Sequence, residues 1–299
     1  MLKNNRLKPS SMHWTNYHSH SNYCDGTHLL EEYVRQAISQ NVKAYGFSGH
    51  APLPFLTNWA MPFEHLVLYF NEINILKQKY AGRIQIYTGL EQDYVPELGI
   101  INQNWKKMPQ LDYIIGSVHF VDKFADGRYW EIDNTTKIFK EGIDQIFQGN
   151  VRKAVERYYE LIREMIQVNK PIIVGHLDKI KMHNRHERFF DEKEAWYQET
   201  VEHTLQTIAD AGVILEINTR GLYKKKSEEV YPSHWIIKRM KDLNIPVMIN
   251  SDAHHPEDIT QEFSTTAQCL QSLGYDTLRV LWNNKWQDVA FNEQGLDLR

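Results

Sequence analysis

Short apolar runs alternate with longer amphipathic stretches along most of this chain. Residues 44–48 and 113–118 are compact apolar runs, a pattern typical of buried β-strands. Residues 27–40 and 151–168 instead repeat apolar side chains three and four positions apart, which indicates helices with one buried face. By these criteria the predicted strands are 14–20, 44–48, 84–90, 113–118, 171–174, 213–217 and 246–250, and the predicted helices are 27–40, 63–80, 151–168, 192–211, 233–243 and 260–273.

The order of these elements predicts the fold class. Repeated strand–helix units without a break in composition favour an α/β fold in which seven parallel strands close into a barrel. We therefore expect a single domain over residues 1–299, with its core at about 14–275. Residues 122–150 show no clean periodicity and are rich in Asp, Gly and aromatic residues. A segment of that length is usually functional, so we predict an insertion or lid loop there.

Composition narrows the class of protein further. Apolar residues make up 42% of the chain and charged residues 24%, as in ordinary globular proteins. The net charge of -4 gives no electrostatic reason to expect a nucleic-acid partner. No apolar run approaches the roughly 18 residues of a membrane span. We therefore expect no membrane partner. Cys24 and Cys269 cannot form a disulfide framework, so we expect a cytoplasmic protein. The oligomeric state stays open.

The polar residues that come after the apolar runs carry the chemistry. His18 and His20 are two positions apart, so a strand would place both imidazoles on one face, although two surface histidines would give the same short motif. The C-terminal ends of parallel barrel strands share one face, which is the face that holds active sites. An imidazole or a carboxylate stands at the end of six different predicted strands, at His20, His50, Glu91, His119, His176 and Asp252.

These residues are too many for one ion. With His18, Asp25 and His254 the set has six imidazoles and three carboxylates, whereas a zinc site takes three or four protein ligands. We therefore predict two or three divalent transition-metal ions, and this ligand mixture suits zinc, iron or manganese. Neighbouring ions share a water, lower its pKa and stabilise charge on a phosphoryl group, so hydrolysis of a phosphate ester by a bridging hydroxide is expected.

The same residues resemble the polymerase-and-histidinol-phosphatase (PHP) superfamily, and more narrowly its histidinol-phosphatase branch. The resemblance covers about residues 16–257. It rests on His18-x-His20 with Cys24-Asp25-Gly26, His50-Ala51-Pro52-Leu53, Glu91, Gly116-Ser117-Val118-His119-Phe120, Gly175-His176-Leu177-Asp178, Glu216-Ile217-Asn218-Thr219, Tyr231-Pro232 and Ser251-Asp252-Ala253-His254.

The resemblance implies a distorted seven-stranded (β/α)7 TIM-like barrel with a trinuclear metal site. It implies one ion held by His18, His20, Glu91 and Asp252, a second by Glu91, His119 and His176, and a third by Asp25, His50 and His254. The implied reaction is cleavage of L-histidinol phosphate to L-histidinol and phosphate in histidine biosynthesis. One departure is Gly49, where many members of the superfamily have Asp, which leaves the orientation of His50 to another group.

A cation is also expected to bind the substrate phosphate. Arg220 comes directly after Asn218-Thr219 and could clamp a phosphate with two hydrogen bonds, and Lys181 and Arg185 are further candidates. The basic segment 179–188 has an equally simple interpretation as a solvated loop.

The sequence also allows several other functions. An amidohydrolase also begins with His-x-His, but it usually has a lysine at the fourth strand and a lone Asp at the last, where this chain has His119, and Asp252 with His254. A PHP-type phosphoesterase acting on another small phosphate ester or on nucleic acid, and a non-catalytic metal-binding barrel, are the other hypotheses. Loss of ligands would indicate the last of these, and all nine are present.

Overall fold

The computed structural model describes residues 12–100 and 108–298, and its centre is a sheet of parallel strands. The strands are arranged around the molecule in the order β1 (Trp14–Asn16), β2 (Val42–Phe47), β3 (Gln85–Val95), β5 (Tyr113–Ser117), β8 (Ile173–Val174), β9 (Ile214–Asn218) and β10 (Val247–Asn250). Each pairs in parallel with its neighbours. The predicted seven-stranded α/β barrel is thereby confirmed.

The barrel closes beyond the ends of its first and last strands. Strands β1 and β10 share no ladder, but the main-chain N–H of His20 donates to the carbonyl of Ala253 (2.8 Å), and the N–H of Ala253 donates to that of His18 (3.2 Å). The strand β1 is therefore shorter than the predicted strand 14–20. Residues 18–20 lie outside it and are held by these separate bonds. The join between the two ends of the sheet therefore lies at the segment that carries His18 and His20.

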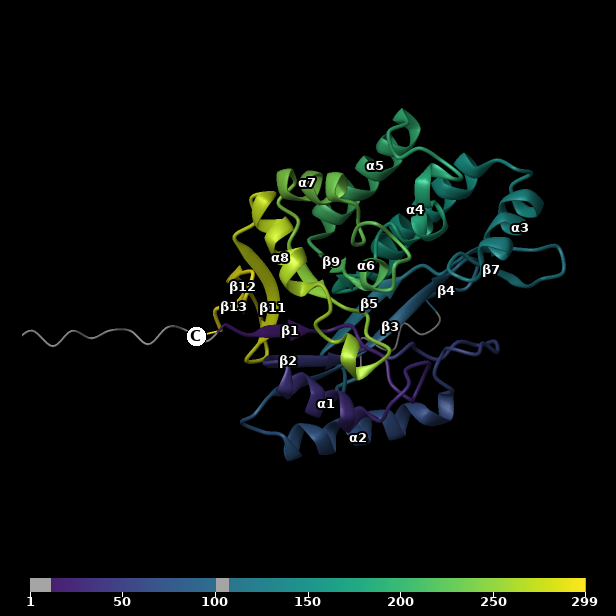
Figure 1. The fold of residues 1–299 in the computed structure, drawn as a ribbon. Helices are drawn as coiled ribbons and strands as arrows, with labels where there is room; N and C mark the ends of the chain where they lie inside the picture. The colour runs from purple at the N-terminus through teal and green to yellow at the C-terminus, as the bar shows by residue number, and fades with distance from the viewer. Residues whose placement is uncertain (1–11, 101–107, 299) are drawn as a thin grey trace, which may run out of the picture.

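Helices cover the outside of the barrel. Figure 1 shows α1 (Leu30–Ser39) and α2 (Leu66–Lys79) beneath β1 and β2, with α4 (Val151–Asn169), α5 (Ala195–Ala211) and α7 (His234–Asp242) on the opposite side of the molecule. The remaining helices are α3 (Thr136–Ile146), α6 (Arg220–Tyr223) and α8 (Phe263–Ser272), and short 3-10 turns occur at Phe63–His65, Lys179–His183, Arg185–Glu187 and Pro256–Asp258. None of the described helices is long and apolar enough to cross a bilayer.

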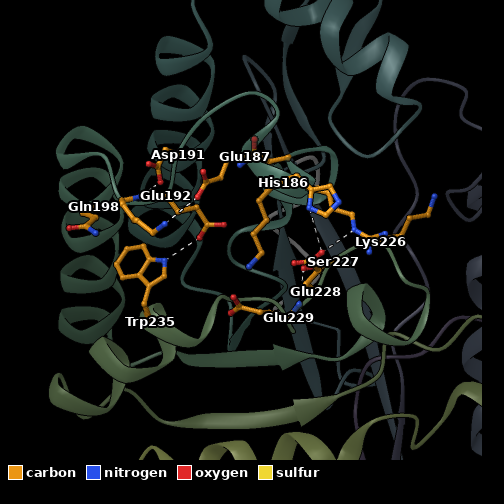
Figure 2. Close-up of a pocket in the computed structure, with 14 residues that line it drawn as sticks. His186, Glu187, Asp191, Glu192, Gln198, Lys226, Ser227, Glu228, Glu229 and Trp235 are labelled. Carbon is orange, nitrogen blue, oxygen red and sulfur yellow. Dashed lines mark hydrogen bonds and ion pairs between the residues drawn. The ribbon is translucent and has the colours of Figure 1, made fainter.

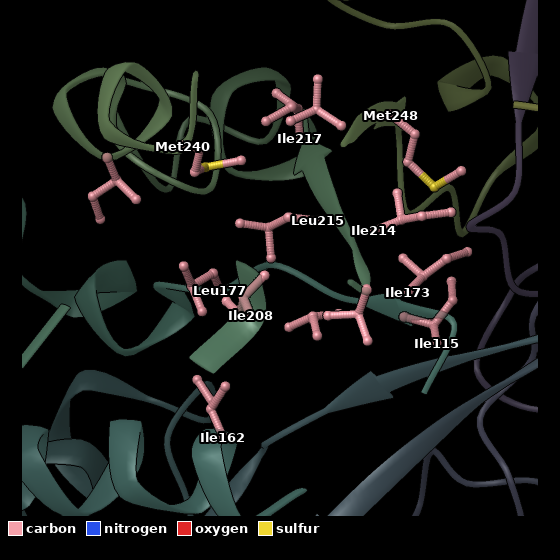
Figure 3. Close-up of a cluster of buried hydrophobic side chains, with 14 of the residues drawn as sticks. Ile115, Ile162, Ile173, Leu177, Ile208, Ile214, Leu215, Ile217, Met240 and Met248 are labelled. Carbon is pink, nitrogen blue, oxygen red and sulfur yellow. The ribbon is translucent and has the colours of Figure 1, made fainter. Parts of the chain in front are cut away.

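The apolar faces of these helices pack on the sheet in two clusters. The larger one includes Ile162 of α4, Ile208 of α5, Met240 of α7 and Leu215 of β9, and Ile115 of β5 lies beside Ile173 of β8 in the same cluster (Figure 3). The second cluster lies beneath α1 and α2 and includes their buried residues Val34, Tyr69 and Ile73. Burial of both faces explains why the strands are continuous apolar runs rather than alternating ones.

The segment 122–150 is more regular than its sequence suggested. It contains most of a hairpin of β6 (Phe120–Lys123) and β7 (Tyr129–Glu131), and then α3. The Thr135 hydroxyl caps α3 by accepting from the N–H of Ile138 (3.3 Å). The buried residues of α3 are Phe139, Gly142 and Ile143. The sequence does not show the helical spacing of apolar residues clearly, because one of the three buried positions is a glycine that makes room for the ring of Trp130.

A second sheet comes after the last barrel unit. Strands β11 (Thr277–Trp282), β12 (Lys285–Asn292) and β13 (Gly295–Leu296) form an antiparallel sheet that the sequence analysis did not predict. It joins the barrel through Tyr17, whose hydroxyl donates to the carbonyl of Leu281 (2.8 Å). The short strand β4 (Gly99–Ile100) pairs antiparallel with the end of β3.

Candidate active site

The polar residues predicted from the strand ends lie together at one end of the barrel. His20, His50, Glu91, His119, His176 and Asp252 are all buried. Neighbouring imidazole rings are close, with centroids 4.3 Å apart for His20 and His50 and 5.0 Å apart for His119 and His176. Residues that are distant in sequence therefore form one cluster, as the parallel strands require.

Glu91 lies at the centre of this cluster. One carboxylate oxygen, Oε1, is 3.0 Å from Nε2 of His176 and accepts a 2.6 Å hydrogen bond from the Ser117 hydroxyl. The other, Oε2, is 3.2 Å from Nε2 of His18 and 3.0 Å from Nδ1 of His50. One side chain thus contacts imidazoles from three other strands or strand ends.

Potential ligand atoms gather in several sets around Glu91. Within each set, one ligand atom per residue lies within 4.8 Å of all the others. The sets are His18, His20 and Asp252; Glu91, His119 and His176; His20, Asp25, His50 and His254; and His50, Asp93 and His119. Shared members show that the sets adjoin one another.

Two further carboxylates contact the Nδ1 atoms of histidines in the cluster and so orient their rings. Glu216 Oε1 is 2.7 Å from Nδ1 of His18, and its other oxygen accepts from the main-chain N–H of His176 (3.0 Å). Asp93 Oδ1 is 2.7 Å from Nδ1 of His119. Such partners fix the tautomer and the direction of a metal-binding imidazole. The sequence analysis did not assign these roles, although Asp93 stands two positions after Glu91 on β3, a spacing that places both on one face.

His50 is oriented by packing and by Glu91. Its ring lies edge to face against Trp59, with centroids 4.6 Å apart. A Cβ at Gly49 would lie 3.2 Å from both Cys24 Sγ and Met61 Cε, so the position before His50 is tightly enclosed. The orientation of His50 therefore comes from the ring of Trp59 and from the Glu91 carboxylate, whose Oε2 is 3.0 Å from Nδ1 of His50.

Their surroundings lower the pKa values of one carboxyl and one imidazole of the cluster. Burial alone would raise the pKa of the Glu91 carboxyl, but the charges of His18 and His50 outweigh it and hold that pKa well below its ordinary range. Burial and the nearby His20 and Arg220 lower the pKa of His254 to about 4. Glu91 is therefore ionised and His254 neutral at pH 7, and both are forms that bind metal ions.

Several buried atoms of the cluster suit a metal ion better than a hydrogen bond. Among the described residues, Nε2 of His18, Nε2 of His20, Nδ1 of His50 and Oδ1 of Asp25 are buried without an aligned hydrogen-bond partner. An unsatisfied buried polar atom costs about 1–3 kcal/mol. Lone pairs that converge without donors are the arrangement that divalent cations require, so these residues fit the predicted metal ions.

Comparison with known proteins agrees with this geometry. Residues 16–220 match the sequence profile of the PHP domain. The chain belongs to the PHP family. This PHP protein is 30% identical over 259 residues to the histidinol-phosphatase of Bacillus subtilis, an alignment that covers 81% of this chain and 94% of that relative. Its place is therefore in the histidinol-phosphatase branch of the family.

Two solved structures share the PHP fold. A Listeria monocytogenes protein, provisionally described as the histidinol phosphatase HisK, has a TM-score of 0.75 at 28% identity and covers 84% of this chain and 99% of its own. The histidinol phosphate phosphatase HisK of Lactococcus lactis, solved with Zn, L-histidinol and phosphate, has a TM-score of 0.70 at 21% identity and covers 95% of this chain and 98% of its own. The second likeness shows the fold alone.

The three predicted phosphate-binding cations lie in two different places. Arg220 lines the candidate pocket, which also includes His50, Glu91, His119, Asp252 and His254. Its Nη1 donates to the main-chain carbonyl of Asp252 (2.8 Å). Lys181 and Arg185 line a separate cavity of about 710 Å³. Figure 2 shows this cavity, with Glu192, Glu228 and Trp235 among the residues around it. There Lys181 is buried with its Nζ 2.9 Å from Asp178, and Arg185 lies 3.3 Å from Glu228. Of these three cations, the structure thus places only Arg220 beside the polar cluster around Glu91.

A cation that the sequence analysis did not single out lies in the pocket with Arg220. The ammonium of Lys179 is 3.1 Å from Nε2 of His119 and 3.0 Å from Oδ2 of Asp133. The segment 179–188 was expected to be a solvated loop, but a 3-10 turn directs Lys179 inward. Its position three residues after His176 was the available signal.

Proposed function

We propose that this PHP protein hydrolyses L-histidinol phosphate to L-histidinol and inorganic phosphate with the help of divalent metal ions. The observation that carries the proposal is the Glu91 cluster, in which imidazoles and carboxylates from separate strands converge on one buried carboxylate. The relationship to the Bacillus subtilis histidinol-phosphatase supports the choice of substrate. A small phosphate ester matches a pocket of about 220 Å³.

We assign the predicted ligands to three positions. The first would be held by His18, His20, Glu91 and Asp252, the second by Glu91, His119 and His176, and the third by Asp25, His50 and His254. Each assignment is supported by a set of ligand atoms that lie within 4.8 Å of one another, with Glu91 in contact with His18 as well. Zinc, iron and manganese all suit such mixed nitrogen and oxygen ligands.

Ions bound there would lower the pKa of a water molecule and neutralise charge that develops on the phosphoryl oxygens. The chain's own residues prepare that chemistry. Glu216 and Asp93 keep the Nδ1 atoms of His18 and His119 occupied, which leaves each Nε2 directed at the cluster. Arg220 and Lys179 supply the positive charge that a phosphate group needs at the mouth of the pocket.

The proposal includes neither a nucleic-acid partner nor a membrane partner. A net charge of -4 gives no basic field for nucleic acid, and the pocket is small for a polynucleotide strand. None of the described helices could span a membrane. Both cysteines are free, which supports the proposed cytoplasmic location.

The test is release of phosphate from histidinol phosphate, p-nitrophenyl phosphate and a short oligonucleotide, each with and without a chelator. The proposal predicts rapid, chelator-sensitive release from histidinol phosphate and slower release from the aryl ester. Activity on the aryl ester alone would indicate a general phosphatase, and preferential cleavage of the oligonucleotide would indicate a nuclease. No activity in metal-loaded protein would support a non-catalytic barrel.

A further inference from the structure

One wall of the candidate pocket comes from the hairpin and α3 insertion rather than from the barrel. Glu131, Asp133 and Asn134 line the same pocket as His119 and Asp252. Glu131 is the last residue of β7 and pairs with Phe120 of β6, the residue directly after His119. This pairing fixes Glu131 beside the metal-ligand cluster without making it a member of any of the ligand sets around Glu91.

The two carboxylates on this wall differ in how their charge is balanced. Asp133 is paired with Lys179 at 3.0 Å. Glu131 accepts a hydrogen bond from the Asn134 amide (3.1 Å), and no Lys, Arg or His of residues 12–100 and 108–298 lies within ion-pair distance of it. Glu131 therefore offers an uncompensated negative charge to whatever enters the pocket.

Glu131 also lies at the border with an aromatic pocket. That second pocket, of about 380 Å³, is lined by the rings of Phe55, Phe120, Phe124 and Tyr129 and by Arg128, which pairs with Asp126. Glu131 and Asn134 line both pockets. The rings of Phe55 and Tyr129 stack with centroids 4.7 Å apart. The Lys123 ammonium already lies over the Tyr129 ring, 4.7 Å from its centroid, and the Arg128 guanidinium lies 5.1 Å from that of Phe124. An organic cation at this border would therefore be attracted by the Glu131 carboxylate, through a charge-assisted hydrogen bond.

We propose that Glu131 is a specificity-determining residue that binds the cationic part of the substrate while the phosphate lies at the metal ligands. This inference rests on the proposed function, which supplies a substrate with an amine and an imidazole next to its phosphate ester. Either group reaches Glu131 through the same charge-assisted hydrogen bond. A phosphate ester of an uncharged alcohol has no partner for Glu131.

The test compares the wild type with Glu131→Gln in the metal-loaded protein. Removal of the charge is expected to raise KM for histidinol phosphate by about tenfold or more and to weaken binding of L-histidinol, measured by calorimetry, by a similar factor. KM for p-nitrophenyl phosphate and the metal content should stay the same. Glu141→Gln is the matched control, because Glu141 belongs to the same insertion, lies 3.8 Å from Lys137 and lines neither pocket.

The outcomes separate this inference from the proposed function. Unchanged affinity for L-histidinol in Glu131→Gln, or an equal loss for both phosphate esters, would overturn the role of Glu131. A wild type that binds L-histidinol through Glu131 but does not hydrolyse histidinol phosphate would contradict the proposed function alone. Binding of N-acetyl-histidinol assigns the contact, since a persistent effect of the variant indicates the imidazole and a lost effect indicates the amine, and either result supports the subsite.

Discussion

At the scale of single residues, the partner of one ring nitrogen decides what the other can do. In three imidazoles of the cluster Nδ1 is already occupied, by Glu216 at His18, by Asp93 at His119 and by the main-chain carbonyl of Asp252 at His254. Their Nε2 atoms are left for other partners. The residues that contact Nδ1 therefore help to set the direction of each Nε2.

Glu216→Gln should weaken metal binding. The amide keeps the shape of the side chain but loses the charge that holds His18, so we expect metal affinity to fall by about 10–100-fold, with kcat restored by excess metal. Competition with a fluorescent chelator measures the affinity. Glu202→Gln, an exposed glutamate paired with Arg239, is the control. An unchanged metal affinity in Glu216→Gln would show that Glu216 is not a positioning residue.

Arg220→Ala should impair turnover more than the same change at Arg185. Arg220 lines the pocket, whereas Arg185 lies in the separate cavity and pairs with Glu228. Loss of a charged hydrogen bond to phosphate should lower kcat/KM by about tenfold to a hundredfold, and steady-state kinetics on histidinol phosphate measure the effect. Equal effects of the two variants would remove Arg220 from the phosphate site.

At the scale of elements, the packing of α3 on the β6–β7 hairpin depends on one close contact. A Cβ at Gly142 of α3 would lie 2.1 Å from the ring of Trp130, which is fully buried. Gly142→Ala should therefore displace α3 and destabilise the protein by about 1–3 kcal/mol, measured by denaturant unfolding. Lys140→Ala, at an exposed position of α3, should change stability little. A Gly142→Ala variant as stable as the wild type would mean that α3 does not pack on Trp130.

An ion-pair network joins α1 to α2 and should make stability depend on pH. Glu31 contacts Arg35 (2.7 Å), Lys79 (2.8 Å) and the hydroxyl of Tyr80 (2.6 Å). Hydrogen bonds from Lys79, Tyr80 and Arg35 lower the pKa of Glu31 from 4.5 to about 2. Because the pKa in the folded state is the lower one, the carboxylate stabilises the fold above about pH 4.5, and this stabilisation is lost as the pH falls toward 2.

Glu31→Gln should therefore reduce stability at neutral pH and match the wild type near pH 2. Unfolding measured at several pH values tests this, with Glu156→Gln, whose partner is Arg152 on α4, as the control. A difference between wild type and variant that is the same at every pH would contradict the lowered pKa of Glu31.

At the scale of the whole molecule, the sequence predicts those features that periodic burial determines. The strands and the convergence of His20, Glu91 and Asp252 could be predicted, because parallel strands bury both faces and end on one side. The strands β11 and β12 were missed because half-exposed antiparallel strands leave only a short alternating pattern. Lys179 was missed because the inward turn of a basic segment depends on Asp133, a partner distant in sequence.

The central claim is that buried ligands around Glu91 hold the metal ions on which hydrolysis depends. The most direct measurement is metal content against turnover of histidinol phosphate, in protein stripped with a chelator and then reloaded. The account predicts no turnover in stripped protein, full recovery only as about two to three equivalents bind per chain, and fewer bound ions in Glu91→Gln. Full turnover by protein that retains less than about one equivalent would contradict it.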